Sequence, residues 1–488
     1  MAERIVIVGG SIAGLATALA LSRIGKDVVV LEQDAPPPQG STQELFTTWK
    51  RRGVPQLRHS HGFLARLRNL LRDRYPDLLE ALLAEGAREQ SIGDSLPPVL
   101  APAYQPAPDD DDLTGLLCRR TTFERVLHAY VSEQPRVSLQ SGVKVYGLHH
   151  TLDHAVPRLT GLLLQQGETP QEMATETIID ATGRLSPFPS WLRDLGVELL
   201  EDQHETGIVY YTRYYRLRDG VEAPRRTNHS SMGDLGYLKF GVFPADRQTF
   251  SLTLAIPTVE TDLRILKNND VFSQVCQCLP ALSPWLDPAC SEPTTNVFIM
   301  DGLRNTYRQV VVDNQPVVHG FLAVGEAAIH TNPLYGRGCS LSFLHAHLLA
   351  DAFAAHSHDT ERLRHFHHAT TQQLQPFYEA AVQRDTASLH RAQQGMTGPR
   401  PLRLRERLMR SFVQHGLATA MRGDLHVRRA FLRDFHMLEP PNVAIRRPAI
   451  LLRILRFWLR GKRRNAHLYT PSAGPNREEM RRLLGLAA

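Results

Sequence analysis

The stretch that decides the fold is Ile5–Gly14, which reads IVIVGGSIAG. Its first four residues are β-branched and apolar, as is typical of a strand buried in a parallel sheet. The alanine- and leucine-rich segment Leu15–Ile24 predicts a helix, which Gly25 ends. A second strand is expected over Asp27–Leu31, and Glu32 follows it. Strand, glycine turn, helix, strand and acid in this order predict a dinucleotide-binding βαβ unit.

The glycine turn has a specific physical purpose. Gly9 allows the tight turn, a small middle residue lets the helix N-terminus approach a pyrophosphate, and Gly14 lets the helix pack closely on the strand. Ser11 occupies the middle position, where glycine is usual, so the site departs slightly from the pattern. Glu32 is placed to accept hydrogen bonds from a ribose diol. The residues expected to hold the dinucleotide are Gly9, Ser11, Ala13, Gly14 and Glu32. The turn alone does not distinguish FAD from NAD, and a tight turn without a nucleotide is the other interpretation.

Bulk composition narrows the class of protein. With 488 residues, 42% of them hydrophobic and 22% charged, the chain has the material for two or three globular subdomains. A net charge of +6 is small for this length, which argues against a nucleic-acid partner. Five scattered cysteines form neither a disulfide framework nor a zinc pattern, and no run of about eighteen apolar residues is present. We therefore expect a cytoplasmic protein without a signal peptide.

Four further segments carry a family resemblance. They read GVPQLRHSH at Gly53–His61, RRTTFE at Arg119–Glu124, DATGR at Asp180–Arg184 and GFLAVGEAAIHTNPLYGRG at Gly320–Gly338. Together with the glycine turn they resemble the flavin monooxygenases of the para-hydroxybenzoate-hydroxylase type. The first segment is most similar to the branch that contains the monensin and lasalocid polyether epoxidases of secondary metabolism. The resemblance extends from the N-terminus to about residue 395, and it implies FAD as the cofactor.

The resemblance assigns roles to basic residues. It implies that Arg58 neutralises the FAD pyrophosphate or meets the flavin edge, with His59 and His61 near the ring; an ordinary exposed basic loop is the alternative. It also implies that an arginine at the start of the helix after Cys118 contacts the cofactor. Arg120 is favoured for this contact, and Arg119 remains an alternative.

The resemblance also places later segments at the cofactor. Strand Val143–Val145 is expected beside the adenine, and Thr175–Asp180 is expected as another parallel strand. Asp180 and Gly183 would mark a sharp turn at the cofactor. Gly325 and Glu326 stand where the family usually has Gly-Asp, whose carboxylate holds a ribityl hydroxyl. The glycines Gly336 and Gly338 would aim a helix N-terminus at the flavin pyrimidine, which stabilises the anionic reduced ring.

Candidate substrate and catalytic residues come from two further regions. High β-propensity between residues 200 and 300 predicts an inserted antiparallel sheet. Tyr211 and Arg213 alternate onto one face of a strand there, either facing a substrate or packing in a half-buried sheet. The resemblance alone makes His61, Asn332 and Pro333 candidates for lining the reacting face. No histidine group has a metal-ligand pattern, so no metal is expected.

The predicted architecture is an α/β fold with an α+β insert. A Rossmann-like FAD-binding domain would occupy residues 1–200, with the loop 40–112 near flavin and substrate, and would continue at 301–395. Residues 201–300 would form the antiparallel substrate sheet, and 396–488 a helical C-terminal region. The basic, leucine-rich stretch 449–464 has two interpretations: a helix covering the substrate cavity, or one that rests weakly on an anionic membrane.

The function implied is that of an FAD-dependent monooxygenase. With O₂ it would epoxidise or hydroxylate a lipophilic or aromatic metabolite through a C4a-(hydro)peroxyflavin. The electrons would come from NAD(P)H, directly or through a separate flavin reductase. Thr182 stands where the hydroxylases have an aspartate that serves NAD(P)H, and so it argues against the direct route. An FAD-dependent dehydrogenase or oxidase is the main alternative, followed by a non-catalytic flavoprotein. A flavin halogenase is disfavoured because the Trp-x-Trp-x-Ile-Pro segment is missing.

Overall fold

A computed structural model describes residues 4–153, 156–397 and 403–486 of the chain. The predicted fold class is confirmed, because a parallel sheet lies at the centre of a mixed α/β structure. Its strand order is β20-β9-β1-β2-β5. The bounds are β1 Ile5–Val8, β2 Val28–Glu32, β5 Val137–Ser141, β9 Thr177–Asp180 and β20 Phe321–Ala323. Strands β1 and β9 are buried along their whole length, as their apolar sequences require.

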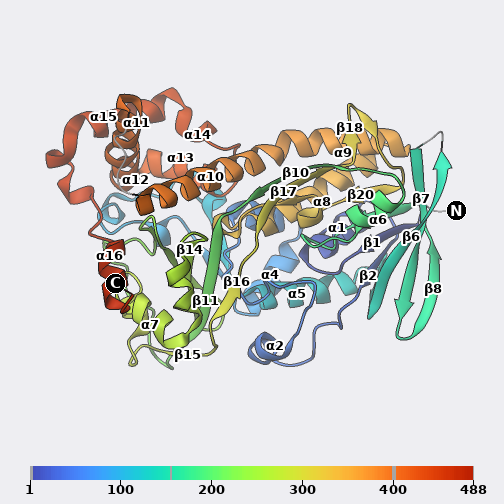
Figure 1. Ribbon diagram of the computed structural model, residues 1–488, viewed down its shortest axis with the longest axis horizontal. Coiled ribbons are helices and arrows are strands. Elements are labelled where there is room, and N and C mark those ends of the chain that lie inside the picture. Colours follow the sequence, from blue (N-terminus) through green and yellow to red (C-terminus); the bar gives the residue numbers. More distant parts are fainter. Residues whose placement is uncertain (1–3, 154–155, 398–402, 487–488) are drawn as a thin grey trace.

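Helices cover this sheet, and the most deeply buried of them follows the glycine turn. Helix α1 (Ile12–Arg23) packs against α8 (Gly338–Ala355), and small side chains such as Ala16 and Ala20 let the two approach closely. The remaining helices of this part are α2 Thr42–Thr48, α3 Ala65–Arg74, α4 Pro76–Ala84, α5 Arg120–Ser132, α6 Phe188–Asp194 and α9 Asp359–Gln373. Figure 1 shows α1, α5 and α8 gathered around β1 and β2 in the right half of the molecule.

One strand prediction is wrong in its pairing. Val143–Val145 begins β6 (Val143–Asp153), which pairs antiparallel with β7 (Val156–Gln166), and β7 pairs with β8 (Thr169–Ala174). The parallel neighbour of β2 is instead β5. The cause is Gly142, whose positive φ of 74° turns the chain between β5 and β6 and so takes β6 out of the parallel sheet.

The predicted antiparallel insert is present as a second sheet. Its bounds are β11 Ile208–Leu217, β12 Met232–Asp234, β13 Lys239–Pro244, β14 Thr249–Pro257, β15 Ser291–Pro293 and β16 Phe298–Met300. One face packs on α7 (Asn269–Gln277) and forms a core of its own. A small sheet, β10 (Leu200–Glu205), β17 (Arg304–Gln309) and β21 (Ile329–His330), joins the insert to the parallel sheet (Figure 1). Two short hairpins complete the strands: β3 Arg88–Gln90 with β4 Gly115–Leu117, and β18 Val311–Val312 with β19 Gln315–Pro316.

The C-terminal part is helical, as expected. Its helices are α10 Gln375–Thr397, α11 Leu404–Ser411, α12 Ala418–Gly423, α13 Leu425–Phe435, α14 Val443–Arg446, α15 Pro448–Arg464 and α16 Arg477–Leu483. Figure 1 shows α11 to α15 in one cluster at the upper left, while α16 runs down beside α7. Met480 of α16 is buried in the core of the antiparallel sheet. Within the described ranges, no helix has both the length and the apolar character to cross a membrane.

Candidate active site

The turn between β1 and α1 has room for glycine alone at two positions. Gly9 has φ of +109°, and a Cβ there would lie 2.5 Å from the carbonyl oxygen of Ala181. A Cβ on Gly14 would lie 1.8 Å from the carbonyl oxygen of Gly9. The Gly10 N–H donates to Glu32 Oε2 at 2.7 Å, so the acid at the end of β2 closes the turn. This packing gives the backbone cradle that a pyrophosphate requires in front of α1.

Arg120 connects this turn to the rest of the site. Its Nη2 donates to Ser11 Oγ at 3.1 Å, and its Nη1 lies 3.5 Å from His61 Nε2. The side chain is buried and also pairs with Glu124 one turn along α5. Arg119, in contrast, binds Asp246 through its backbone N–H and its guanidinium, away from the turn. Of the two alternatives, the geometry therefore favours Arg120 as the cofactor contact.

A buried ion network that sequence reasoning missed supports the same turn. Arg51 pairs with the carboxylates of Glu32, Asp34 and Glu124 at 2.8, 3.1 and 2.5 Å. Because Arg120 also pairs with Glu124, the two arginines hold this carboxylate between them. Only the fold brings α5 beside the end of β2, so spacing along the chain contained no signal for this network.

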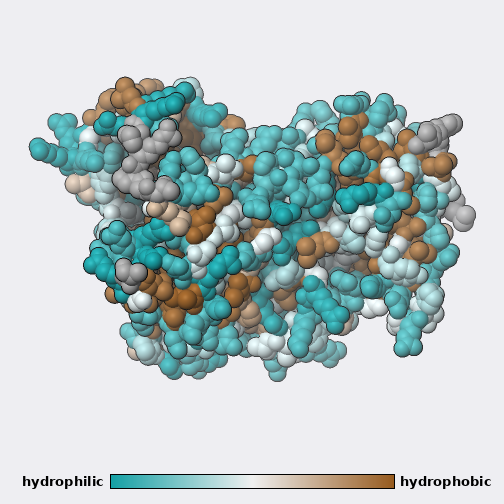
Figure 2. Space-filling view, viewed as in Figure 1, coloured by the Kyte–Doolittle hydropathy of each residue, from teal (hydrophilic) through white to brown (hydrophobic). Residues whose placement is uncertain are grey.

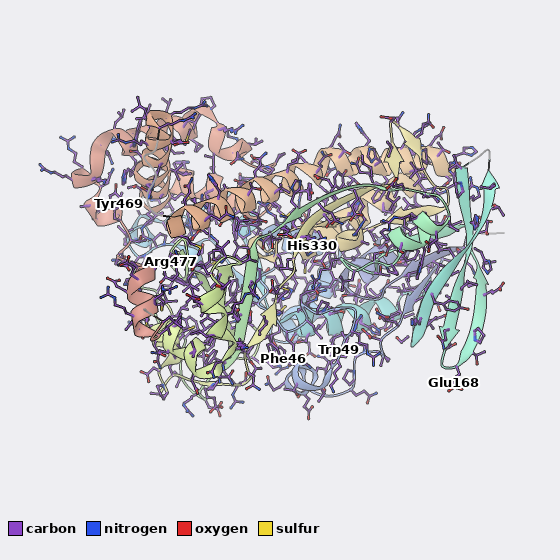
Figure 3. All side chains as sticks on the ribbon, in the orientation of Figure 1. Phe46, Trp49, Glu168, His330, Tyr469 and Arg477 are labelled. Carbon is purple, nitrogen blue, oxygen red and sulfur yellow. The ribbon has the colours of Figure 1, made fainter. Side chains whose placement is uncertain are left out.

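The prediction for Arg58 is wrong. Its guanidinium donates to the carbonyl oxygens of Phe46, Thr47 and Trp49, at 2.8, 2.9 and 3.1 Å. These carbonyls end α2, and their negative partial charge holds the cation there. Phe46 and Trp49 are labelled in the lower centre of Figure 3. Arg58 thus fastens α2, and it does not line the cavity that Arg120 faces.

Of the two histidines of the same loop, His59 is buried and His61 is half-buried, and both are neutral. His61 Nδ1 lies 2.8 Å from the carbonyl oxygen of His59, so it is the protonated nitrogen, and Nε2 faces Arg120. Burial and then the charge of Arg120 lower the pKa of His61 to about 3. His59 contacts Thr212 of β11 at 3.1 Å, and burial lowers its pKa to about 4. His61 therefore offers an uncharged imidazole to the cavity at neutral pH.

The turn after β20 meets α1 from the other side. Gly325 has φ of +59°, and a Cβ there would lie 2.6 Å from Ala13 Cβ. Its N–H donates to His345 Nδ1 at 3.2 Å, which makes that buried histidine structural. Glu326 points into the cavity, where Gln56 donates to its Oε2 at 3.2 Å. A Cβ on Gly338 would lie 3.2 Å from Glu326 Oε1, so the carboxylate lies against the start of α8.

Asn332 and Pro333 play different parts. The Asn332 amide donates to Asp385 of α10 at 2.8 Å, and its oxygen accepts from the Tyr210 hydroxyl and from the Leu334 N–H. Asn332 is buried, anchors the loop and does not line the cavity, so its expected place at the reacting face is corrected. Pro333 does line the cavity, as do Gly336 and Gly338.

Of the two interpretations of Tyr211 and Arg213 on β11, the structure supports packing in a half-buried sheet. Tyr211 and Arg213 do share a face, but it is the one that packs on α7, where Arg213 donates to Ser273 at 2.9 Å. Tyr210 and Thr212 point the other way and line the cavity. Alternation sets which residues share a face, whereas the element packed on each face is set by the tertiary fold.

The remaining predicted residues surround the turn. Asp180 is buried at the end of β9 and accepts from Thr182 Oγ1 at 2.6 Å and from Ser186 at 2.5 Å; burial raises its pKa. Gly183 follows with φ of +83°. Val145 packs on the main core, just after Gly142, whose N–H donates to the Asp34 carbonyl at the end of β2. Among the described residues no group of three metal-ligand side chains occurs.

A cavity of about 1320 Å³ joins these residues to the antiparallel sheet. At one end it is lined by Arg120, Glu326 and the loop around His61. Its middle is walled by strands β13, β14 and β16, with Gly241, Thr253, Ala255 and Met300 on the same sheet face as Tyr210. Helices of the C-terminal part close the far end. The volume exceeds the roughly 300–1,000 Å³ of an ordinary ligand pocket, as expected of a site that holds part of a cofactor together with a substrate.

Comparisons with known proteins agree with this anatomy. A family model described as FAD dependent oxidoreductase matches residues 4–81. Protein Rv3254 of Mycobacterium tuberculosis is 26% identical over 380 residues, which are 72% of this chain and 73% of the relative. These residues 4–81 contain the glycine turn and the His61 loop, and the match supports FAD as the cofactor of an oxidoreductase enzyme.

Solved structures share the fold across most of the chain. The flavin-dependent brominase Bmp2 has a TM-score of 0.61 at 16% identity, with 94% of this chain and 100% of that chain covered. PqsL, a probable FAD-dependent monooxygenase from Pseudomonas aeruginosa, has a TM-score of 0.55 at 14% identity and 80% and 98% coverage. OxyS anhydrotetracycline hydroxylase from Streptomyces rimosus has a TM-score of 0.54 at 16% identity and 90% and 76% coverage. At these identities the likeness shows the fold alone.

Proposed function

We propose that the protein is an FAD-dependent monooxygenase that epoxidises or hydroxylates a lipophilic or aromatic small-molecule metabolite. One oxygen atom of O₂ enters the product and the other leaves as water, and NAD(P)H supplies the two electrons. The observation that carries this proposal is the single cavity that extends from Arg120 and Glu326 to the apolar wall of the antiparallel sheet. Such a cavity holds an organic substrate against a cofactor and keeps water away from both.

The cofactor-binding residues proposed are those around the glycine turn. The α1 N-terminus and Arg120 would face the pyrophosphate, and Glu32 the adenosine ribose. Glu326 would hold a ribityl hydroxyl, and the start of α8 at Gly338 would face the flavin pyrimidine. Asp180, Gly183, Val145, Gly325 and Gly336 complete the set and shape the backbone around these groups. When bound, the reduced flavin supplies the activation of oxygen.

The protein's own contribution is positioning and a defined charge state. Among the described residues, no carboxylate is bonded to His61 that could act with it as a general base. Its Nδ1 contacts the His59 carbonyl, and its Nε2 faces Arg120. Because the imidazole of His61 is neutral, Arg120 is the cation beside it, and its positive charge would favour the anionic reduced ring. Pro333 and His61 would form the walls of the reacting end, and Tyr210 and Thr212 would contact substrate in place of Tyr211 and Arg213.

Two finer proposals rest on the family resemblance. The GVPQLRHSH segment favours epoxidation, as in the polyether branch, over hydroxylation. Thr182 Oγ1 is bonded to Asp180, so a separate flavin reductase is the favoured electron route. We propose O₂ and a flavin reductase as partners, and a cytoplasmic location. Anaerobic reduction of the FAD-loaded protein by NADH or NADPH, with and without a reductase, tests the route: rapid reduction by NAD(P)H alone would contradict it.

The experiment that tests the function compares oxygen products with and without candidate substrates. The FAD-loaded protein is supplied with electrons in air, and hydrogen peroxide and product are measured per electron pair. For a monooxygenase, substrate lowers peroxide release and a product 16 Da heavier appears, since one oxygen atom is added. An oxidase would instead produce peroxide in proportion to substrate. A halide-dependent product would point to a halogenase, a class that shares the fold.

A second proposal concerns the surface of α15. In the C-terminal part, the cavity is lined by residues of the π-helical turn η8 (Phe412–Leu417), of α12 and of α13, but by none of the described residues of α15. Helix α15 packs behind them through Trp458, which donates to Ser411 at 3.0 Å. The outer side of α15 exposes Leu452 and Leu459 beside Arg456 and Arg460. Of the nineteen exposed large apolar side chains among the described residues, nine lie between residues 404 and 459. Figure 2 shows brown atoms among teal over α11 and α15 at the upper left. We infer that this face rests on an anionic membrane surface.

A further inference from the structure

Three arginines gather where the C-terminal helices close the cavity. They are Arg226 of the loop before β12, Arg422 of α12 and Arg428 of α13, and all three line the cavity. Arg422 Nη2 donates to the carbonyl of Asn228 at 3.3 Å, which ties its helix to the loop that carries Arg226. Burial, and then the charges of Arg226 and Arg422, lower the pKa of Arg428 to about 10. Arg226 and Arg422 therefore both lie close enough to repel the charge of Arg428.

No acid neutralises this cluster at contact distance. In the described part of the chain none of the three side chains has a carboxylate within 4.0 Å. Asp94, which also lines the cavity, acts on Arg226 from farther away, and its carboxylate accepts hydrogen bonds from Ser91. One negative charge against three positive ones leaves the cluster with a net charge of about +2.

The hydrogen bonds of the cluster orient the guanidinium groups without balancing their charge. Arg428 Nη2 donates to the Ser95 carbonyl at 3.0 Å, and Arg422 Nε donates to the Leu468 carbonyl at 2.8 Å. Arg428 Nε is buried and has no partner. Tyr469, labelled at the left of Figure 3, follows Leu468 and lines the same end of the cavity. A buried, unsatisfied donor beside like charges is costly unless a ligand supplies the acceptor.

The chemistry of the cavity changes along its length. Between the arginines and the Arg120 end, the wall includes Ala255, Met300 and Leu334, which form one apolar cluster with Tyr210. A ligand that matches both parts has an anionic group at one end and an apolar body at the other. Guanidinium groups pair best with carboxylate and phosphate oxygens, to which they offer several parallel N–H donors.

We propose that Arg226, Arg422 and Arg428 bind the carboxylate or phosphate group of an amphiphilic substrate, whose apolar part reaches the Arg120 end of the cavity. The inference rests on the proposed function only in taking that end as the place of reaction. The anion site itself stands on the cavity and the unbalanced charge. It narrows the substrate class from any lipophilic metabolite to an acidic one.

Binding to the FAD-loaded, oxidised protein tests the site without any turnover. Calorimetric titration compares dodecanoate, kept below its critical micelle concentration, with dodecan-1-ol, kept below its solubility limit. Dodecyl phosphate, also below its critical micelle concentration, distinguishes phosphate from carboxylate. We expect an anion to bind at least about 10-fold more tightly than the alcohol, since a charged hydrogen bond contributes about 1.5–3 kcal/mol. Arg428→Gln and Arg226→Gln should each remove most of this preference. Arg456→Gln, which deletes the same charge on the exposed face of α15, should leave it intact.

Equal affinity of the unmodified protein for the alcohol and both anions would overturn the inference, and so would a full preference in Arg226→Gln. Arg226 lies on an exposed loop, so this variant tests the site even if Arg428→Gln does not fold. The two proposals fail separately. Anion preference without oxygen insertion would contradict the monooxygenase alone, whereas oxygen insertion into an uncharged substrate without anion preference would contradict the anion site alone.

Discussion

Arg120 Nη2 lies 3.1 Å from Ser11 Oγ, so the first residue of α5 touches the turn in front of α1. Ser11 is the residue that departs from the glycine pattern, and its hydroxyl accepts this hydrogen bond in place of capping α1. The serine in place of glycine therefore forms a hydrogen bond with Arg120. This bond holds the Arg120 side chain between the turn and His61.

The first prediction contrasts Arg120 with Arg58. Arg120→Ala should weaken FAD binding about 10- to 100-fold, because a charged donor contributes about 1.5–3 kcal/mol to an anionic ligand. Arg58→Ala should lower the melting temperature, because it frees three carbonyl oxygens at the end of α2, yet leave FAD affinity within about twofold. Fluorescence titration of the apoprotein with FAD measures the two affinities, and thermal unfolding measures the melting temperature. The reverse order of effects would restore Arg58 as the cofactor contact.

The second prediction contrasts the two faces of β11. Tyr210→Phe removes the buried hydroxyl that donates to Asn332, and should lower kcat/KM about 10-fold as the loop at Pro333 loses its anchor. Tyr211→Phe, on the face that packs on α7, should leave kcat/KM unchanged. Steady-state kinetics with any accepted substrate measures both values. An equal loss of kcat/KM in the two variants would contradict the assignment of the Tyr210 face of β11 to the cavity.

The third prediction concerns acid stability. Burial, the largest cause in each case, lowers the pKa of five histidines to between about 3 and 4: His59, His61, His345, His347 and His436. In the unfolded chain these groups have pKa values near 6.5, so between pH 6.5 and 4 the unfolded state binds more protons. The contribution of these histidines to the free energy of unfolding should therefore be complete above pH 6.5. It should be lost as the pH is lowered towards 4.

Urea unfolding at pH 7 and at pH 5 checks this sign. Asp180 and Asp385 act in the opposite direction, because burial raises their pKa values, but they are two groups against five. Replacing His345 by Asn should weaken the pH dependence, whereas replacing the exposed His467 should not change it. Equal stability at the two pH values would contradict the burial of neutral imidazoles.

The fourth prediction tests the outer face of α15. The protein should co-sediment with phosphatidylglycerol vesicles and not with phosphatidylcholine vesicles, because its exposed leucines lie beside arginines. Replacing Leu452 and Leu459 by Ser should abolish co-sedimentation. Leu185→Ser, at an equally exposed leucine outside the C-terminal helices, should leave it unchanged. Unchanged co-sedimentation of the double variant would contradict the proposal that α15 contacts the membrane.

Local patterns in the sequence predicted much of the fold. The run Ile5–Gly14 determines β1, the turn and α1 because each depends on neighbours in the chain: β-branched residues for the strand, glycine for the turn and small residues for the helix. The antiparallel insert was predictable for the same reason. Strand β6 was placed wrongly because the change of direction at Gly142 depends on a single positive φ.

The candidate site was less predictable, because its residues come together from distant segments. Arg51 and Glu124 are far apart in the sequence, and nothing local signals their ion pair. The family resemblance misled for Arg58, since its partners are the carbonyls at the end of α2. Of the arginines at the far end of the cavity, Arg226 belongs to a loop of the insert and Arg422 and Arg428 to the C-terminal part, all outside the segments that carry the resemblance.

The fate of oxygen from ¹⁸O₂ tests the central claim most directly. The FAD-loaded protein is reduced in the presence of an accepted substrate and exposed to ¹⁸O₂ in ordinary water, and the product is analysed by mass spectrometry. A monooxygenase incorporates one ¹⁸O atom per product molecule. A product formed without label, with all the labelled oxygen recovered as hydrogen peroxide, would contradict the account and identify an oxidase.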